Sequence, residues 1–385
     1  MAAVPFAALV ASLTEEYFAD DLQLPSDADQ WAPADLRKFF ETGGFTRPPL
    51  ADLVDVSECA PTELTRAPAT VAAAATDAPT AGITLKAAGS KRFSSSAAPK
   101  VFVTSQGIRI VYQLSIGRDP TKPTLVILGG GQTGREAACQ QFGAESDAWR
   151  EHTVLIFDRR NTGASDVCYD GVGDSASGGV SENEVQAADV IELLIGLSLT
   201  PCILIGFSSG ARLFALIAFA RPEIVCGLAL LILTGGAQAV TALGATYYGQ
   251  YAQAARTGGM AAVLATPFYA GCAEANARSR QALVDMKPAA FEAAMEASMA
   301  VYERTRAEPA LALPAAQLRK LEGESVFVAN FFGEGPHDGM HTAAVSRAVA
   351  DCIDGVEAVV STDVREWFGA LARFVARRSR AHVAM

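Results

Sequence analysis

From Lys100 onward, short apolar runs alternate with longer stretches that repeat apolar residues at helical spacing. Residues 101–104 and 108–113 instead alternate apolar with polar positions around Gln106-Gly107, which predicts a β-hairpin. The apolar runs predict strands at 124–128, 153–158, 203–207, 225–234, 324–330 and 356–361, and the stretches between them predict helices at 136–149, 182–197, 342–352 and 364–377. We therefore expect an α/β fold with a mostly parallel, doubly wound sheet that begins with an antiparallel hairpin.

One block interrupts this alternation. Residues 237–320 contain one helical stretch after another, for example 289–306, with glycine or proline between them. In a sheet protein, an insertion of this kind after a strand forms a cap over the carboxyl edge of the sheet, where ligands bind.

The residues before the sheet fall into two segments. Residues 1–56 predict a small helical segment, in which a helix at 35–40 ends at Gly43-Gly44. Residues 57–99 are rich in Ala, Thr, Ser and Pro, which predicts a disordered linker. The sheet domain would then span residues 100–385, with its cap at about 237–320.

Composition narrows the class of partner and the compartment. The 31 basic residues against 42 acidic residues give a net charge of −11, which argues against nucleic acid or an anionic membrane surface as the main partner. Seven dispersed cysteines without a C-x-x-C pair indicate free thiols in a reducing compartment.

The apolar start of the chain favours an amphipathic helix over a signal peptide, because it lacks a basic region and Glu15 and Glu16 follow at once. No apolar run is long enough to span a bilayer, and the longest candidate, 225–233, fits a buried strand. We therefore expect a cytoplasmic protein.

The stretch around Ser208 carries the first chemical signal. Gly206-Phe-Ser-Ser-Gly210 follows a predicted strand and precedes a helix that runs to about residue 220. The pattern G-x-S-x-G at this place is the nucleophile elbow of serine hydrolases, in which the serine is exposed at the amino end of a helix. From the pentapeptide alone, a glycine-rich turn with an incidental serine is an equal alternative.

A second glycine-rich turn, 129–134, also follows a predicted strand and matches G-x-G-x-x-G. The next strand ends in Asp158, before Arg159 and Arg160, so a dinucleotide-binding unit is one possible interpretation. Two observations count against it: a hairpin precedes the glycine strand, and the elbow at Ser208 would have no role.

Three motifs stand in register along the chain: Leu128-Gly-Gly-Gly131, the stretch 158–165 and Gly206-Phe-Ser-Ser-Gly210. In this order and spacing they resemble the α/β-hydrolase superfamily, in its branch with a serine nucleophile and a helical cap. By its order of elements, the resemblance covers roughly residues 100–378 and leaves the first 99 residues outside.

The resemblance implies a role for each matched position. Ser208 would be the nucleophile, and the backbone N–H groups of Gly131 and Ser209 would form the oxyanion hole. Gly129 stands where the superfamily usually has His, a change that backbone donors tolerate. Asp338 falls where the superfamily has the acid of the triad; without that context, a turn residue that caps the next helix is equally possible.

One position departs from the superfamily. Its catalytic His lies in the loop after the last strand, and here that loop, 361–365, contains no His. The whole chain has four: His152, His337, His341 and His382. We interpret His152, at the other edge, as structural. His382 lies in a basic, frayed tail and could reach the site only if that tail folded back.

His337 and His341 flank Asp338, and without a base Ser208 is a poor nucleophile. One hypothesis is that His341 is the base, oriented by Asp338 or Glu334. The other is that His341 only caps or packs at a helix start, and that the fold has lost hydrolysis and binds a ligand under its cap.

The cap is rich in aromatic residues and methionines: Tyr247, Tyr248, Tyr251, Met260, Phe268, Tyr269, Met286, Met295, Met299 and Tyr302. Their helical spacing favours packing over substrate binding. We expect some to line a mostly apolar pocket for a small molecule with an apolar part. No cluster has metal-ligand spacing, so neither a metal nor a cofactor is expected.

The leading prediction is a serine hydrolase of a carboxylic ester or amide, acting through an acyl-enzyme at Ser208 with Asp338 and His341 as acid and base. The alternative is a non-hydrolytic, ligand-binding member of the same fold. A dinucleotide-binding protein is the third possibility.

Overall fold

The computed structural model of the chain describes residues 99–136, 138, 149–173, 180–332 and 339–383. Several expectations lie outside these residues: the helical segment 1–56, the linker up to residue 98, most of the helix at 136–149, Glu334, His337 and Asp338.

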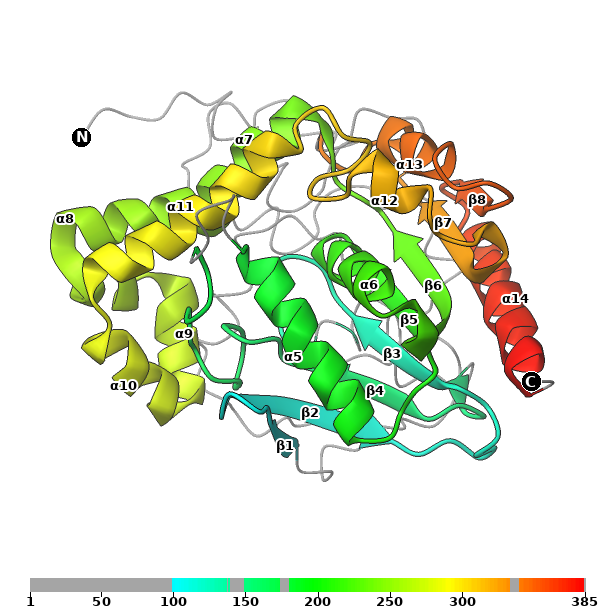
Figure 1. The fold of residues 1–385 in the computed structure, drawn as a ribbon, viewed down its shortest axis with the longest axis horizontal. Helices are drawn as coiled ribbons and strands as arrows, with labels where there is room; N and C mark the ends of the chain where they lie inside the picture. The colour runs from blue at the N-terminus through cyan, green and yellow to red at the C-terminus, as the bar shows by residue number, and fades with distance from the viewer. Residues whose placement is uncertain (1–98, 137, 139–148, 174–179, 333–338, 384–385) are drawn as a thin grey trace, which may run out of the picture.

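In the described part of the chain, eight strands form one sheet in the order β1-β2-β4-β3-β5-β6-β7-β8 (Figure 1). They are β1 (Lys100–Val103), β2 (Arg109–Ser115), β3 (Thr124–Leu128), β4 (Val154–Phe157), β5 (Cys202–Phe207), β6 (Val225–Leu231), β7 (Val326–Asn330) and β8 (Glu357–Val360). β2 pairs antiparallel with β1 and with β4, whereas every other pair is parallel. The predicted fold class, a mostly parallel sheet that begins with an antiparallel hairpin, is therefore confirmed.

The central strands β3 and β5 are buried along their whole length. Successive side chains of a strand point to opposite faces, so Leu125 and Ile127 join one core cluster and Val126 and Leu128 join the other. Because both faces are covered, these strands read in the sequence as continuous apolar runs.

Helices cover both faces of the sheet. They are α5 (Glu182–Gly196), α6 (Ser209–Ala220), the 3-10 turn η5 (Pro222–Ile224), α13 (Ala343–Ala350) and α14 (Val364–Val383). α5 begins with a capping box, in which the Ser181 and Glu184 side chains each accept from the other residue's backbone N–H. The residues of α5, α6 and α13 pack on one face of the sheet, and those of α14 pack on the other.

The residues between β6 and β7 are mainly helical: α7 (Gly236–Gly244), the π-turn η6 (Ala245–Gly249), α8 (Gln250–Leu264), α9 (Pro267–Ala275), α10 (Ala277–Asp285), α11 (Pro288–Arg304), α12 (Ala315–Leu318) and the 3-10 turn η7 (Gly323–Ser325). We call α7, η6 and α8–α11 the cap helices. Tyr251, Phe268, Tyr269 and Met295 pack against one another in a buried cluster of their own. Packing, rather than substrate contact, therefore explains most of the aromatic residues in this segment.

The end of α14 differs from the expectation. The helix continues past residue 377 to Val383, so His382 lies on its last turn and not in a frayed tail. The extension is held against the sheet, because Arg378 Nε donates to the carbonyl of Cys226 at 2.6 Å and Ser379 is buried.

Two smaller observations concern the state of the cysteine thiols and the length of the helices. The described cysteines, Cys168, Cys202, Cys226, Cys272 and Cys352, are all free, and three of them are buried. None of the described helices has the length and apolar character needed to cross a bilayer.

Candidate active site

Ser208 stands at the sharp turn between β5 and α6. Its φ of 52° lies in the left-handed region, which a non-glycine residue rarely adopts. A Cβ on Gly206 would lie 2.6 Å from Ala211 Cα, and one on Gly210 would lie 2.7 Å from the carbonyl oxygen of Leu128. Both glycines are therefore needed for the close approach of strand and helix that positions Ser208, as the elbow motif predicts.

His341 lies beside the serine. Its Nε2 is 2.9 Å from Ser208 Oγ, within hydrogen-bond distance, and both side chains are buried. The loop after β7 carries the histidine, and Asn330, the last residue of β7, donates from Nδ2 to the His341 carbonyl at 2.9 Å. The Phe332 ring contacts the imidazole edge to face, with centroids 5.9 Å apart. Backbone and ring contacts thus hold the imidazole toward Ser208.

The other predicted histidine and acid positions do not meet the serine in the described residues. His337 and Asp338 lie outside them, so the orientation of His341 by Asp338 stays a prediction. His152 Nδ1 donates to the Pro123 carbonyl at 2.9 Å, ahead of β4 and away from the carboxyl ends of the strands. In the loop after β8, the Asp363 carboxylate accepts from the backbone N–H of Arg365.

Gly131 and Ser209, the two predicted oxyanion donors, lie next to each other. Ser209 Oγ donates to the Gly131 carbonyl at 2.7 Å, and the Arg159 guanidinium donates to that carbonyl and, at 3.2 Å, to Ser209 Oγ. Ser209 is the first residue of α6, so its backbone N–H belongs to the positive end of the helix. The loop after β3 and the start of α6 are thereby fixed to each other beside Ser208.

Asp158 has a structural task in the loop that follows β4. Its carboxylate accepts from the backbone N–H of Arg135 at 2.6 Å and of Ala164 at 3.0 Å, and it pairs with the Arg135 guanidinium. A Cβ on Gly134 or Gly163 would lie 2.6 Å from this carboxylate. Because Asp158 is enclosed by its own loops, it cannot bind a ribose, and the dinucleotide interpretation loses the acid on which it depends.

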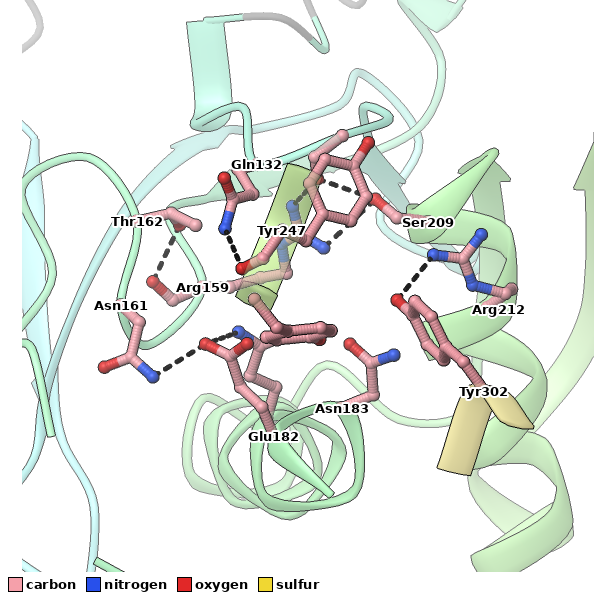
Figure 2. Close-up of a pocket in the computed structure, with 13 residues that line it drawn as sticks. Gln132, Arg159, Asn161, Thr162, Glu182, Asn183, Ser209, Arg212, Tyr247 and Tyr302 are labelled. Carbon is pink, nitrogen blue, oxygen red and sulfur yellow. Dashed lines mark hydrogen bonds between the residues drawn. The ribbon is translucent and has the colours of Figure 1, made fainter. Parts of the chain in front are cut away.

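A cavity adjoins Ser209 between the strand ends and the cap helices (Figure 2). The centre of a water-sized sphere can occupy about 20 Å³ of it, which is room for about one water molecule. It is lined by Gly131, Gln132, Arg159, Asn161, Thr162, Glu182, Asn183, Gln186, Ser209, Arg212, Tyr247, Tyr248 and Tyr302. The lining is mainly polar, so the expectation of a mostly apolar pocket is wrong for this cavity.

Buried charges dominate the lining. Glu182, at the start of α5, accepts from Asn161 Nδ2 at 2.8 Å and from Gln186 Nε2 at 3.2 Å, and burial raises its pKa above the usual range. Burial also lowers the pKa of Arg159, against the opposing attraction of Glu182. Arg212, on α6, is 1% exposed and contacts the hydroxyls of Thr234 and Tyr302.

Arg212 and Glu182 line the cavity although neither was among the predicted site residues, and Tyr302, expected to pack or to line an apolar pocket, contributes a hydroxyl. Arg212 had a signal, because it is the one charged residue in the helix Ser209–Ala220, whose other residues are apolar or small. Tyr302 lies 90 positions away from Arg212, so only the folded chain brings their side chains together.

Comparison with known proteins finds similarity only among solved structures: no protein-family model and no curated protein sequence matches the chain. A hydrolase from Pseudomonas aeruginosa PA01 is 21% identical with a TM-score of 0.45, covering 74% of this chain and 99% of that one. The enol-lactonase from Burkholderia xenovorans LB400 is 18% identical with a TM-score of 0.45, covering 72% and 99%. A thermophilic esterase from Thermogutta terrifontis is 18% identical with a TM-score of 0.44, covering 74% and 99%. The features of this chain that bear on function are its own strand order, the elbow and the Ser208–His341 contact.

Proposed function

We propose that this protein, which has the α/β-hydrolase fold, is a serine hydrolase that cleaves a carboxylic ester or amide through an acyl-enzyme on Ser208. The observation that carries the proposal is the 2.9 Å contact between Ser208 Oγ and His341 Nε2 at the nucleophile elbow. A serine hydroxyl is a weak nucleophile unless a base lies within hydrogen-bond distance, and the imidazole meets that requirement.

The proton moves in two directions during the first half of the reaction. His341 Nε2 accepts the Ser208 proton while Oγ attacks the carbonyl carbon, and the carbonyl π electrons move to its oxygen. When the bond to the leaving group breaks, the imidazolium returns its proton to the alcohol or amine. Asp338 is the group that we expect to accept from the other ring nitrogen and to stabilise the imidazolium; it lies outside the described residues.

The negative charge on the carbonyl oxygen needs donors that are already in place. The backbone N–H groups of Ser209 and Gly131 are our candidates, because the two residues are joined by a hydrogen bond and Ser209 begins α6. Such donors require no reorganisation when the charge develops, and removing one costs about 3 kcal/mol in other hydrolases.

Water completes the cycle by the same steps. It gives a proton to His341, attacks the acyl carbon and releases the acid, while Ser208 Oγ takes the proton back. The cavity has room for about one water molecule, so it cannot hold an acyl group and that water at the same time. We therefore expect Tyr247, Tyr248 and Tyr302, which the cap helices contribute to the lining, to move when a substrate enters.

A fluorophosphonate probe tests the proposal, since it phosphonylates a serine only when that serine is activated. We expect Ser208 of the wild-type protein to be labelled, Ser208→Ala to show no label, and His341→Gln to be labelled about 100-fold more slowly or less. His382→Gln is the matched control and should react like the wild type, because that side chain lies on the last turn of α14.

The same experiment decides between the two readings of the fold. If the wild type remains unlabelled while a known serine hydrolase in the same tube reacts, the non-hydrolytic, ligand-binding alternative replaces the proposal. If labelling is unchanged in His341→Gln, Ser208 is activated by another group and His341 is not the base.

A further inference from the structure

Arg212 is a buried cation with no anionic partner in the part of the chain that the structure describes. It is 1% exposed, and the ion pairs among the described residues involve neither Arg212 nor Arg159. Its Nη atoms donate to the neutral hydroxyls of Thr234 and Tyr302, and its Nε has no hydrogen-bond partner. Burying a charge in this way is unfavourable unless something else compensates for it.

The charges around the cavity do not balance. Arg159 and Arg212 both line it, and Glu182 is its one acidic residue among the described side chains. Glu182 attracts Arg159, whereas Arg159 and Arg212 repel each other. Even with Glu182 ionised, the described lining residues keep an excess of one positive charge, and among them Arg212 is the member without a counter-charge. A bound group with a single negative charge would neutralise this excess.

Arg212 is also placed at the right range from the reacting atoms. It lies four residues after Ser208, and its backbone N–H donates to the Ser208 carbonyl at 3.1 Å, so the two residues occupy successive turns of one helix. Four residues advance a helix by roughly 6 Å. An anionic group bound by the Arg212 side chain would thus sit a few atoms away from a carbonyl at Ser208 Oγ.

The surroundings of the guanidinium favour a small, planar anion. Tyr302 contributes a hydroxyl beside Arg212, and its ring centroid lies 5.7 Å from the guanidinium carbon. Figure 2 shows Arg212 and Tyr302 together on one side of the cavity, with Asn183 between them and Glu182. A carboxylate matches the planar donor edge of a guanidinium and carries the single negative charge that the described lining lacks, whereas a phosphate carries up to two.

We propose that the substrate carries a free carboxylate, bound by the Arg212 side chain, in addition to the ester or amide that Ser208 attacks. This inference rests on the proposed function, because it places the carboxylate relative to the reacting carbonyl. The substrate class is then the monoester or monoamide of a short dicarboxylic acid, or an ester of a hydroxy acid. The buried, unpaired guanidinium is the recognition element.

Calorimetric titration of Ser208→Ala protein tests the inference without turnover. Monomethyl glutarate has the carboxylate, and dimethyl glutarate is its neutral counterpart. A hydrogen bond to a charged group predicts that the monoester binds about 10-fold more tightly or better. Adding Arg212→Gln should abolish the difference, and Arg212→Lys, which keeps the charge, should retain part of it.

Arg221→Gln is the matched control, because Arg221 caps the other end of α6 and is exposed, paired with Glu223. It should leave both affinities unchanged. Near-ultraviolet circular dichroism of each variant reports whether the fold is intact. Equal affinity for the two glutarates, no binding of either at millimolar concentration, or a difference that persists in folded Arg212→Gln protein overturns the inference.

The outcome is separate from that of the labelling experiment. If Ser208 is labelled but the two glutarates bind equally, the proposed hydrolase activity stands and the proposed carboxylate recognition is rejected. If the protein prefers the carboxylate but the fluorophosphonate does not label it, the proposed hydrolase activity is rejected and the carboxylate site remains.

Discussion

Two arginines, Arg160 and Arg212, are each 1% exposed but lie in different surroundings. The Arg160 guanidinium meets the Asp189 carboxylate through Nε and Nη2, both at 2.6 Å. Among the described residues, Arg212 donates to the hydroxyls of Thr234 and Tyr302 and pairs with no carboxylate. We call the surroundings of Arg160 and Asp189, under α5, the paired region, and those of Ser208 and Arg212, at the cavity, the open region.

The difference teaches that burial of a charge is not by itself a sign of function. In the paired region, Asp158 and Arg135 repeat the pattern of Arg160 and Asp189, so the charges there are satisfied by the chain itself. In the open region the buried charges line a cavity that adjoins Ser209, the residue after the proposed nucleophile, and a ligand would complete them. Removing the Asp189 carboxylate should therefore destabilise the protein, whereas removing the Arg212 charge should stabilise it.

The largest effect is expected from Asp189→Asn in the paired region. It leaves Arg160 buried without a counter-charge, which should lower the free energy of unfolding by about 3–5 kcal/mol, measured by urea denaturation. Glu192→Gln is the control: Glu192 lies on the same helix but bonds to Ser105 at the surface, so the change should cost less than about 1 kcal/mol. Equal losses in the two variants would contradict the paired character of this region.

The next effect has the opposite sign. Arg212→Met replaces an unpaired buried cation by an apolar side chain of similar length, and should raise the free energy of unfolding of the ligand-free protein by about 1–2 kcal/mol. Urea denaturation measures this as well. If Arg212→Met instead lowers the free energy of unfolding as much as Asp189→Asn does, Arg212 is a structural residue like Arg160. The two regions would then not differ.

The smallest effect concerns the backbone of the open region. Ser208 has a φ of 52°, and glycine relieves such strain, so Ser208→Gly should gain about 1 kcal/mol while losing fluorophosphonate labelling. Ser198 has a φ of 55° at the end of α5, away from the cavity. Ser198→Gly should give a similar rise in thermal midpoint and keep the labelling. A fall in the midpoint of Ser208→Gly alone would show that the serine side chain stabilises the fold.

Much of the fold could be predicted because the central strands are buried on both faces. β3 has the predicted bounds, and β5 differs by one residue, since a continuous apolar run marks such a strand at both ends. The position of Ser208 could be predicted because Gly206 and Gly210 flank it in a recognisable motif. Both glycines lie so close to neighbouring backbone that a Cβ would clash there.

The rest depends on contacts that the sequence does not encode locally. His341 was one of two histidines near the predicted acid, and only the path of the loop after β7 brings its ring to Ser208. The polar character of the cavity was missed because the cap tyrosines were counted as apolar rings. In the fold, Tyr302 turns its hydroxyl to Arg212 from 90 positions away.

The placement of His341 after β7 has a consequence for the modular construction of the chain. Every group proposed to react or to recognise a substrate lies before Thr342, so the last strand and helix, β8 and α14, contribute packing through side chains such as Trp367 and Phe374. In the usual arrangement, the catalytic histidine ties the chemistry to the final strand. Here that terminal unit reaches the proposed reacting groups through packing: Trp367 stacks on Phe331, which in turn contacts Phe207, the residue before Ser208.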